Sequence, residues 1–411
     1  MRHFRGFLVA LTLFVSLGFI SCKSNQTVAS IPEQRHVIIL SMDGFRWDYT
    51  QHANTPTLDS LRKVGSYSQV MPVFPANTFP NHYAIATGLH PDHHGVTNNA
   101  FYDKELGRIL SVFEKEDCAT ENFWGGEPIW NTVERQGGIA HIYMWPGSEY
   151  KINGRQATVW TPYDHNLDYY KRADKVIASM SLPKEQVPNL VMWYMPEPDS
   201  AGHKHGPNSP EVIKYVEHID QVLGYFMAKM RDTPYFDQTD IIFTADHGMA
   251  QLAPERYINM YNTVDRSKLK YYVAGTPFGF EVEEDYADEL VAELNKLGHL
   301  TAYRADAIPE KFHYGTHPTR ITNVIALPDV GWKIAYSKRD DQLPSGGSHG
   351  YSPYESDMQM VFFAAGPSFK KGYTQATFQN LNIYLLICKI LGVEPAKNDC
   401  NAEDFSDMLL L

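Results

Sequence analysis

The chain is poor in cysteine and in positive charge, and each shortage excludes a class of protein. Four cysteines among 411 residues are too few for a small fold held together by disulfides. The excess of 48 acidic over 36 basic residues gives a formal charge of −12, which argues against a groove that follows a nucleic-acid backbone. Disorder is excluded as well, because 43% of the residues are hydrophobic and 13% are aromatic. A globular protein with a large core remains.

Hydrophobic runs long enough to cross a membrane are also missing, and the first 22 residues instead resemble an export signal. Arg2 and Arg5 flank an apolar run, Phe7–Ile20, that is shorter than the roughly 18 residues of a membrane-spanning helix. The run ends in Ser21-Cys22, and a polar stretch follows. This arrangement resembles a bacterial lipobox, in which Cys22 would carry the lipid; an ordinary cleaved secretory signal is the alternative. We therefore expect an exported protein of the periplasm or cell envelope.

No internal repeat or low-complexity run interrupts the remainder of the chain. The expected organisation is a signal peptide at residues 1–21, a lipidated linker at residues 22–32 and a single domain at residues 33–411. The three other cysteines are Cys118, Cys388 and Cys400. Export permits a Cys388–Cys400 disulfide, and buried free thiols are an equally good interpretation.

A recurring pattern indicates the fold class. Apolar runs of four to seven residues are followed by an acidic or turn residue and then by a helical stretch. The runs are His36–Met42, Ile139–Trp145, Leu190–Met195, Ile241–Ala245, Asn323–Leu327 and Met360–Ala364. Helical spacing of apolar residues is clearest in Pro210–Met230, and residues 284–296 and 381–391 look similar. The alternation predicts an α/β protein with a doubly wound, mostly parallel sheet flanked by helices.

Ligands of such folds bind beyond the carboxyl ends of the strands, so the polar residues there are candidate site residues. Three aspartates follow apolar runs, namely Asp43, Asp199 and Asp246. Histidines accompany two of them, His203 and His247, and His349 lies in a glycine-rich turn. Any one of these aspartates is more often a helix cap or a turn residue. Together, three carboxylates and three imidazoles form a ligand mixture that suits two zinc ions.

A nucleophile is expected where a helix begins. Residues 77–88 indicate a helix with Thr78 at its N-cap and Pro80 in the first turn. Free N–H groups and a partial positive charge at this end suit a phosphate group. A threonine hydroxyl is a poor nucleophile unless a metal activates it, and without the metal ligands Thr78 would be only a capping residue.

With these residues in place, the chain resembles the nucleotide pyrophosphatase/phosphodiesterase family of the alkaline phosphatase superfamily, in a bacterial exported member. The matching stretches lie in family order between residues 41 and 351. They are SMDGFRWDY, NTFPNHYAIATGLHPDHHGV, EPIWNTVERQGG, WPGSE, YMPEPDSAGHKHGP, FTADHGM and GGSHGY. The resemblance implies an alkaline-phosphatase-like fold and a single phosphodiesterase catalytic domain.

The resemblance also implies the roles of the residues. One zinc would be held by Asp199, His203 and His349. The other would be held by Asp43, Asp246 and His247, with Thr78 beside it as the attacking group. Asn99 would bind a phosphoryl oxygen together with the Thr78 backbone N–H, although the residues alone leave a turn asparagine equally open. The implied reaction passes through a phospho-threonine. The histidines His82, His90, His93, His94 and His205 receive no ligand role and are expected behind the ligands or at the surface.

The substrate class is chosen from what surrounds this site. Phosphomonoesterases that resemble this chain carry a Lys-x-Arg pair for a dianionic phosphate, and the region with Lys151 and Arg155 has no such pair. The chain therefore favours a diester, and Phe79, Tyr143 and Tyr194 are candidate contacts for a nucleoside base. The alternatives are a phosphomonoesterase of the same fold, a choline-phospholipid phosphodiesterase, and an inactive metal- or glycan-binding lipoprotein. Expected partners are a small nucleotide substrate and the membrane, with no sequence-specific nucleic-acid binding.

Overall fold

Residue 1, residues 35–338 and residues 343–411 are described in this computed structural model of the chain. The expected export signal, the lipobox cysteine Cys22 and the linker lie outside the described residues, apart from Met1. Within the described part, none of the helices is both long and apolar enough to cross a bilayer.

The largest sheet is built from nine strands and carries most of the hydrophobic core. In spatial order they are β18 (Tyr373–Thr374), β2 (Ser66–Met71), β17 (Met360–Ala365), β8 (Thr239–Thr244), β1 (His36–Met42), β7 (Leu190–Met195), β5 (Ala140–Tyr143) and β6 (Val159–Thr161), and β19 (Phe378–Gln379) also pairs with β2. The strands from β8 to β6 run parallel, whereas β17 is antiparallel to both of its neighbours. The predicted mostly parallel sheet is confirmed, with one antiparallel strand inside it.

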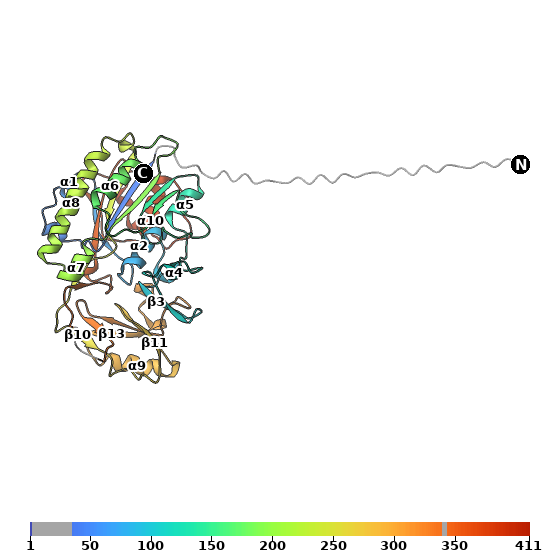
Figure 1. Ribbon diagram of the computed structural model, residues 1–411, viewed down its shortest axis with the longest axis vertical. Coiled ribbons are helices and arrows are strands. Elements are labelled where there is room, and N and C mark those ends of the chain that lie inside the picture. The colour runs from blue at the N-terminus through green and yellow to red at the C-terminus, as the bar shows by residue number, and fades with distance from the viewer. Residues whose placement is uncertain (2–34, 339–342) are drawn as a thin grey trace.

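Helices cover both faces of this sheet, as expected for a doubly wound fold (Figure 1). On one face α8 (Pro210–Met230) packs against α1 (Pro56–Val64), α6 (Tyr169–Ser179) and α7 (Asp199–His205). On the other face α2 (Thr78–Thr87) packs against α10 (Asn382–Leu391) and α5 (Ile129–Arg135). The bounds of α8, β1 and β7 match those that the hydrophobic pattern predicts. Strands buried on both faces produce the continuous apolar runs seen in the sequence.

A second, smaller sheet has its own hydrophobic core, to which α9 (Ala287–Leu294) contributes. Its strand order is β11 (Leu269–Val273), β12 (Phe278–Val282), β14 (Val324–Pro328) and β13 (Leu300–Arg304), and all its pairs are antiparallel. The apolar run 323–327, expected in the parallel sheet, therefore belongs to β14 of this smaller sheet. An apolar run indicates a buried strand but not its partner, which explains the difference. Figure 1 shows this sheet and α9 at one end of the molecule.

The remaining elements are short. The two-stranded pairs are β3 (Ala100–Asp103) with β4 (Arg108–Ser111), β9 (Ala250–Gln251) with β16 (Gly347–Ser348), and β10 (Tyr257–Asn259) with β15 (Lys333–Ala335). The short α-helices are α3 (Pro91–His94) and α4 (Lys115–Cys118). Single 3-10 turns are Tyr49–Gln51, Phe236–Gln238, Glu284–Tyr286, Ala305–Ala307, Glu310–Phe312, Ser356–Met358, Ala402–Asp404 and Ser406–Met408.

The central strands β7, β1 and β8 explain where the site lies. They are adjacent and parallel, with Met42 opposite Met195 and Ser41 opposite Thr244. Their carboxyl ends therefore meet at one edge of the sheet, as expected for a ligand-binding edge. Each of the three candidate aspartates follows one of these ends within a few residues.

Candidate active site

The structure brings the six predicted metal ligands together as two groups of three. In each group, one ligand atom from every residue lies within 4.8 Å of the others. The groups are Asp199, His203 and His349, and Asp43, Asp246 and His247. This is the division that the family resemblance implies.

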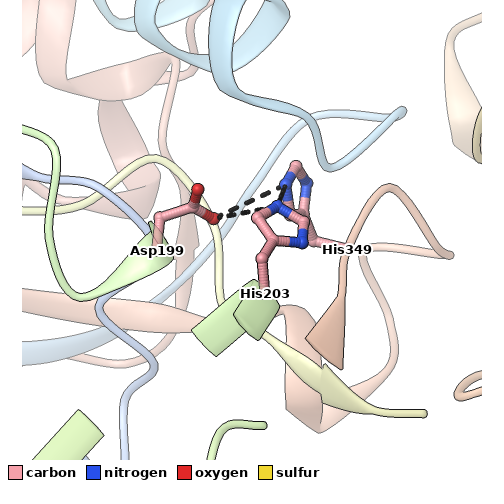
Figure 2. Close-up of side chains that lie close together, drawn as sticks. All are labelled: Asp199, His203 and His349. Atoms are coloured by element: carbon pink, nitrogen blue, oxygen red, sulfur yellow. Dashed lines mark hydrogen bonds and ion pairs between the residues drawn. The ribbon is translucent and has the colours of Figure 1, made fainter. Parts of the chain in front are cut away.

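The first group joins α7 to the loop that follows β16. Asp199 begins α7 and His203 lies one turn later, so that their side chains share one face of the helix. The Nε2 atoms of His203 and His349 lie 3.5 and 3.6 Å from Asp199 Oδ1, and 3.0 Å from each other. Figure 2 shows the three side chains converging on one point.

The second group lies deeper, beyond β1 and β8. The Nε2 atom of His247 is 3.5 Å from Asp43 Oδ1 and 3.1 Å from Asp246 Oδ2. All three residues are buried. His247 also stacks on His349, with ring centroids 3.7 Å apart, so the two groups are neighbours within one site.

The hydrogen bonds of the three histidines leave the same ring nitrogen available. Nδ1 of His203, His247 and His349 lies 2.8–3.0 Å from the backbone carbonyl oxygens of Gly347, Gly248 and Ala76, respectively. A carbonyl oxygen can only accept, so each Nδ1 donates its proton and each Nε2 presents a lone pair. Two facing lone pairs repel each other, and a cation between them would relieve this.

The carboxylates of the site also have oxygen atoms without a hydrogen-bond donor. Asp43 Oδ1, Asp199 Oδ1 and Asp246 Oδ2 are buried and have no hydrogen-bond partner among the described residues. These are the oxygens that face the histidine Nε2 atoms. Buried polar atoms without a partner are rare and costly, so the donor set fits two divalent cations. Carboxylate and imidazole together suit zinc.

Without a cation the charges of the site would be strongly suppressed. Burial, followed by the proximity of other carboxylates, raises the pKa of Asp43, Asp199 and Asp246 well above the usual range. Burial lowers the pKa of His247 to about 3, and it also lowers the pKa of His349. Bound dications would favour the ionised carboxylates and the neutral imidazoles, which are the forms that ligate metals.

Thr78 lies beside the second group at the start of α2. Its Oγ1 is 3.2 Å from His247 Nε2. The predicted N-cap is wrong by one residue, because Asn77 has the extended backbone of the cap and Thr78 is the first helical residue. The side chain of Asn77 donates instead to Asn98 and to the carbonyl of Thr276. The Thr78 hydroxyl is therefore not used in capping and lines the cavity.

Asn99 lies on the same wall as Thr78. Its Oδ1 accepts the backbone N–H of Phe79 at 3.0 Å, so its amide nitrogen keeps its two protons for another partner. The neighbouring Asn98 is buried and accepts from Asn77 and from the Asn99 backbone. The two asparagines thus differ in environment, and Asn99 is the one at the cavity.

A cavity of about 490 Å³ opens next to both ligand groups and is lined by aromatic side chains. Of the three predicted base contacts, Phe79 and Tyr194 line the cavity, whereas Tyr143 lies outside its lining and bonds Ser179 at 2.6 Å. Four further aromatic side chains line the cavity and were not predicted from the sequence. These are Phe113, Trp145, Tyr150 and Tyr163. Among these four, only Trp145 had a sequence signal, because it is the first residue of the WPGSE motif.

Charged groups other than the ligands are few at this cavity. Lys115 and Glu149 line it, whereas Lys151 and Arg155 are exposed and lie outside its lining. Cys118 is a free thiol at the wall, and Cys388 and Cys400 are also free thiols. Burial raises the pKa of Cys118 to about 11, so it is protonated at neutral pH.

Comparison with known proteins identifies the family. The family model of type I phosphodiesterases and nucleotide pyrophosphatases matches residues 37–352. Human ectonucleotide pyrophosphatase/phosphodiesterase family member 5 is 32% identical over 400 residues, which is 97% of this chain and 83% of that protein. The chain belongs to the type I phosphodiesterase / nucleotide pyrophosphatase family.

Further comparisons with relatives and with solved structures agree. The venom phosphodiesterase CdcPDE of Crotalus durissus collilineatus is 34% identical over 379 residues, and these cover 89% of this chain but 45% of the venom protein. The chain thus spans less than half the length of that relative. The solved human family member 5 has a TM-score of 0.86 at 30% identity and covers 92% of this chain. Its murine counterpart, an inactive threonine-to-alanine variant in complex with AMP, has a TM-score of 0.85 at 31% identity.

Proposed function

We propose that this protein hydrolyses phosphodiester and pyrophosphate bonds of nucleotides, with two zinc ions and a phospho-threonine intermediate at Thr78. The observation that carries the proposal is the pair of three-residue ligand groups beside one hydroxyl at a helix start. Family membership supports the reaction class, and the AMP bound by the murine relative supports a nucleotide substrate.

Bound zinc would supply Lewis acidity, lowering the pKa of the attacking hydroxyl and neutralising charge on the departing oxygen. The chain itself would orient the reaction. Thr78 Oγ1 is the attacking atom, and the Thr78 backbone N–H at the start of α2 would bind a phosphoryl oxygen, because the Phe79 N–H is bonded to Asn99 and Pro80 has none. The amide of Asn99 is available for the same oxygens. Hydrolysis of the phospho-Thr78 ester would then regenerate the hydroxyl.

A diester is favoured over a monoester by the charges of the cavity. The described lining contains Lys115 but no pair of cations that could clamp a dianionic phosphate. The aromatic side chains around Phe79 suit a nucleoside, whose base gains about 1–3 kcal/mol from stacking. We also propose that the protein is exported, because relatives include venom and ectonucleotide enzymes. An anchor at Cys22 is proposed from the sequence alone, because the apolar run that ends in Ser21-Cys22 resembles a lipobox.

The test compares three nitrophenyl substrates with the zinc-loaded full chain. They are the nitrophenyl ester of a nucleoside 5′-monophosphate, nitrophenyl phosphate and a choline nitrophenyl phosphodiester. We expect the nucleotide diester to have the highest kcat/KM and chelation of zinc to abolish its turnover. Monoester turnover equal to or above that of the diester would overturn the substrate class. Bound zinc without hydrolysis of any ester would establish the inactive alternative.

A further inference from the structure

A histidine outside the two ligand groups connects the nucleophile to one of them. His82 lies one turn after Thr78 in α2, and its side chain is fully buried. Its Nδ1 atom is 2.9 Å from the Thr78 carbonyl oxygen and 3.3 Å from Asp246 Oδ2. Its Nε2 atom is 2.8 Å from Ser41 Oγ, in the strand that leads to Asp43.

These partners fix the tautomer of the ring. The Thr78 carbonyl can only accept a hydrogen bond, so Nδ1 carries the proton. Nε2 then has a lone pair and accepts the Ser41 hydroxyl proton. Nδ1 also lies 3.3 Å from Asp246 Oδ2 without a hydrogen bond to it, and this oxygen has no hydrogen-bond partner among the described residues. Asp246 Oδ1 accepts the backbone N–H of Gly44.

The rest of the ring is held by the walls of the cavity. Trp145 and Tyr194 each meet the His82 ring edge to face, with centroids 5.2 Å apart. The Trp145 indole N–H also donates to the His82 carbonyl at 3.1 Å. Because the buried ring is packed against Trp145 and Tyr194, it cannot rotate away from Thr78 and Asp246 without displacing these neighbours.

We propose that His82 is a positioning residue that sets the orientation of the Asp246 carboxylate and of the Thr78 turn relative to each other. This inference rests on the proposed function for the two bound zinc ions and for its kinetic consequence. Partners behind a metal ligand commonly contribute about 10- to 100-fold to metal affinity or activity. A merely structural histidine would instead affect folding stability and leave the ligands unchanged.

The experiment measures zinc affinity and kinetics in the full chain. We expect His82→Phe, which keeps a ring but removes both nitrogens, to weaken one of two bound zinc ions by about 10- to 100-fold. With nucleotide diester, kcat should fall over a similar range while KM changes little. His82→Asn places an amide N–H where Nδ1 stands and should recover most of both losses.

A matched control is available in the neighbouring short helix. His94 is equally buried and donates from Nε2 to the Pro80 carbonyl at 3.2 Å, without contact to a ligand residue. His94→Phe should lower the melting temperature but leave both zinc affinities and kcat unchanged. Equal zinc affinities in His82→Phe and the wild type, or equal losses in His94→Phe, would overturn the proposal.

Two further measurements test the role of His82 even if the phenylalanine variant does not fold or the wild type shows no turnover. Should His82→Phe fail to fold, His82→Asn and His82→Gln decide, because glutamine places its N–H near Nε2 rather than Nδ1. The proposal requires tighter zinc binding in Asn than in Gln, and equal binding would refute it. The zinc titration does not depend on turnover. If the wild-type protein hydrolyses no ester, the proposed function is rejected, and the zinc affinities of the variants still test the role of His82.

Discussion

The Tyr194 hydroxyl donates a hydrogen bond to Asp43 Oδ2 at 2.6 Å, directly behind the second ligand group. The other oxygen of Asp43 faces His247 and lacks a hydrogen-bond partner among the described residues. Tyr194 therefore decides which carboxylate oxygen is left for a cation. It was expected as a substrate contact, and its place in the cavity wall is compatible with both roles.

We predict that Tyr194→Phe weakens zinc binding at the Asp43 group by about 10-fold or more, because Asp43 loses the donor that orients it. The ring stays, so the aromatic wall and the KM for a nucleotide diester should change little. Isothermal titration with zinc and steady-state kinetics measure the two effects separately. A raised KM with unchanged zinc affinity would instead assign the hydroxyl to the substrate.

Thr78 gives a second prediction. Thr78→Ala should reduce turnover to background while the protein retains both zinc ions, because the six ligand side chains remain. Thr78→Ser keeps a hydroxyl at the same position and should retain part of the activity. Metal content by atomic absorption and release of nitrophenol from a nucleotide diester are the measurements. Full activity in Thr78→Ala would remove Thr78 from the mechanism.

The metal ligands could be predicted from the sequence, whereas most of the aromatic residues of the cavity wall could not. The aspartates were predictable because parallel strands bring their carboxyl ends to one edge, so a residue after each apolar run is placed by the fold. Phe113 and Tyr163 were not, since they are 71% and 45% exposed on connecting segments that have no periodicity. Loop aromatics acquire a partner only through the tertiary fold.

The same reasoning applies to strand partners. The runs that became β1 and β14 look alike as sequences, but β1 is central in the parallel sheet and β14 pairs antiparallel in the smaller one. The apolar content of a strand indicates that it is buried, but it does not determine which strand pairs with it or whether the pair is parallel or antiparallel. Tyr143 is a related case, because it is the last residue of β5 and its hydroxyl bonds Ser179, which its position beside a motif does not indicate.

The aromatic wall gives a third prediction. Phe79→Ala should raise the KM for a nucleotide diester by roughly 5- to 150-fold, corresponding to about 1–3 kcal/mol of lost base stacking. Phe113 meets Phe79 edge to face with centroids 6.0 Å apart, so Phe113→Ala should act in the same direction. Tyr143→Phe is the matched control and should leave KM unchanged, because its hydroxyl bonds Ser179 outside the cavity lining. A larger effect in Tyr143→Phe than in Phe79→Ala would contradict this assignment.

A fourth prediction concerns acid stability at the junction between α3 and the turn ending at His313. Burial, reinforced by the neighbouring His313 and His93 rings and opposed by Asp399, lowers the pKa of His90 from 6.5 to about 4. His90 is 5% exposed, its ring stacks on His313 at 4.2 Å, and its Nδ1 has no hydrogen-bond partner among the described residues. Protonating this ring in the folded state is therefore unfavourable.

The sign of the effect follows from proton binding. Between pH 6.5 and about 4 the unfolded chain protonates His90 and the folded chain does not, so the free energy of unfolding falls as the pH falls. The loss from this residue is about 3 kcal/mol near pH 4. Replacing His90 by Phe removes the titrating group, so urea unfolding of that variant should depend less steeply on pH over this interval than unfolding of the wild type. Parallel pH profiles for the two proteins would show that His90 titrates normally in the folded chain.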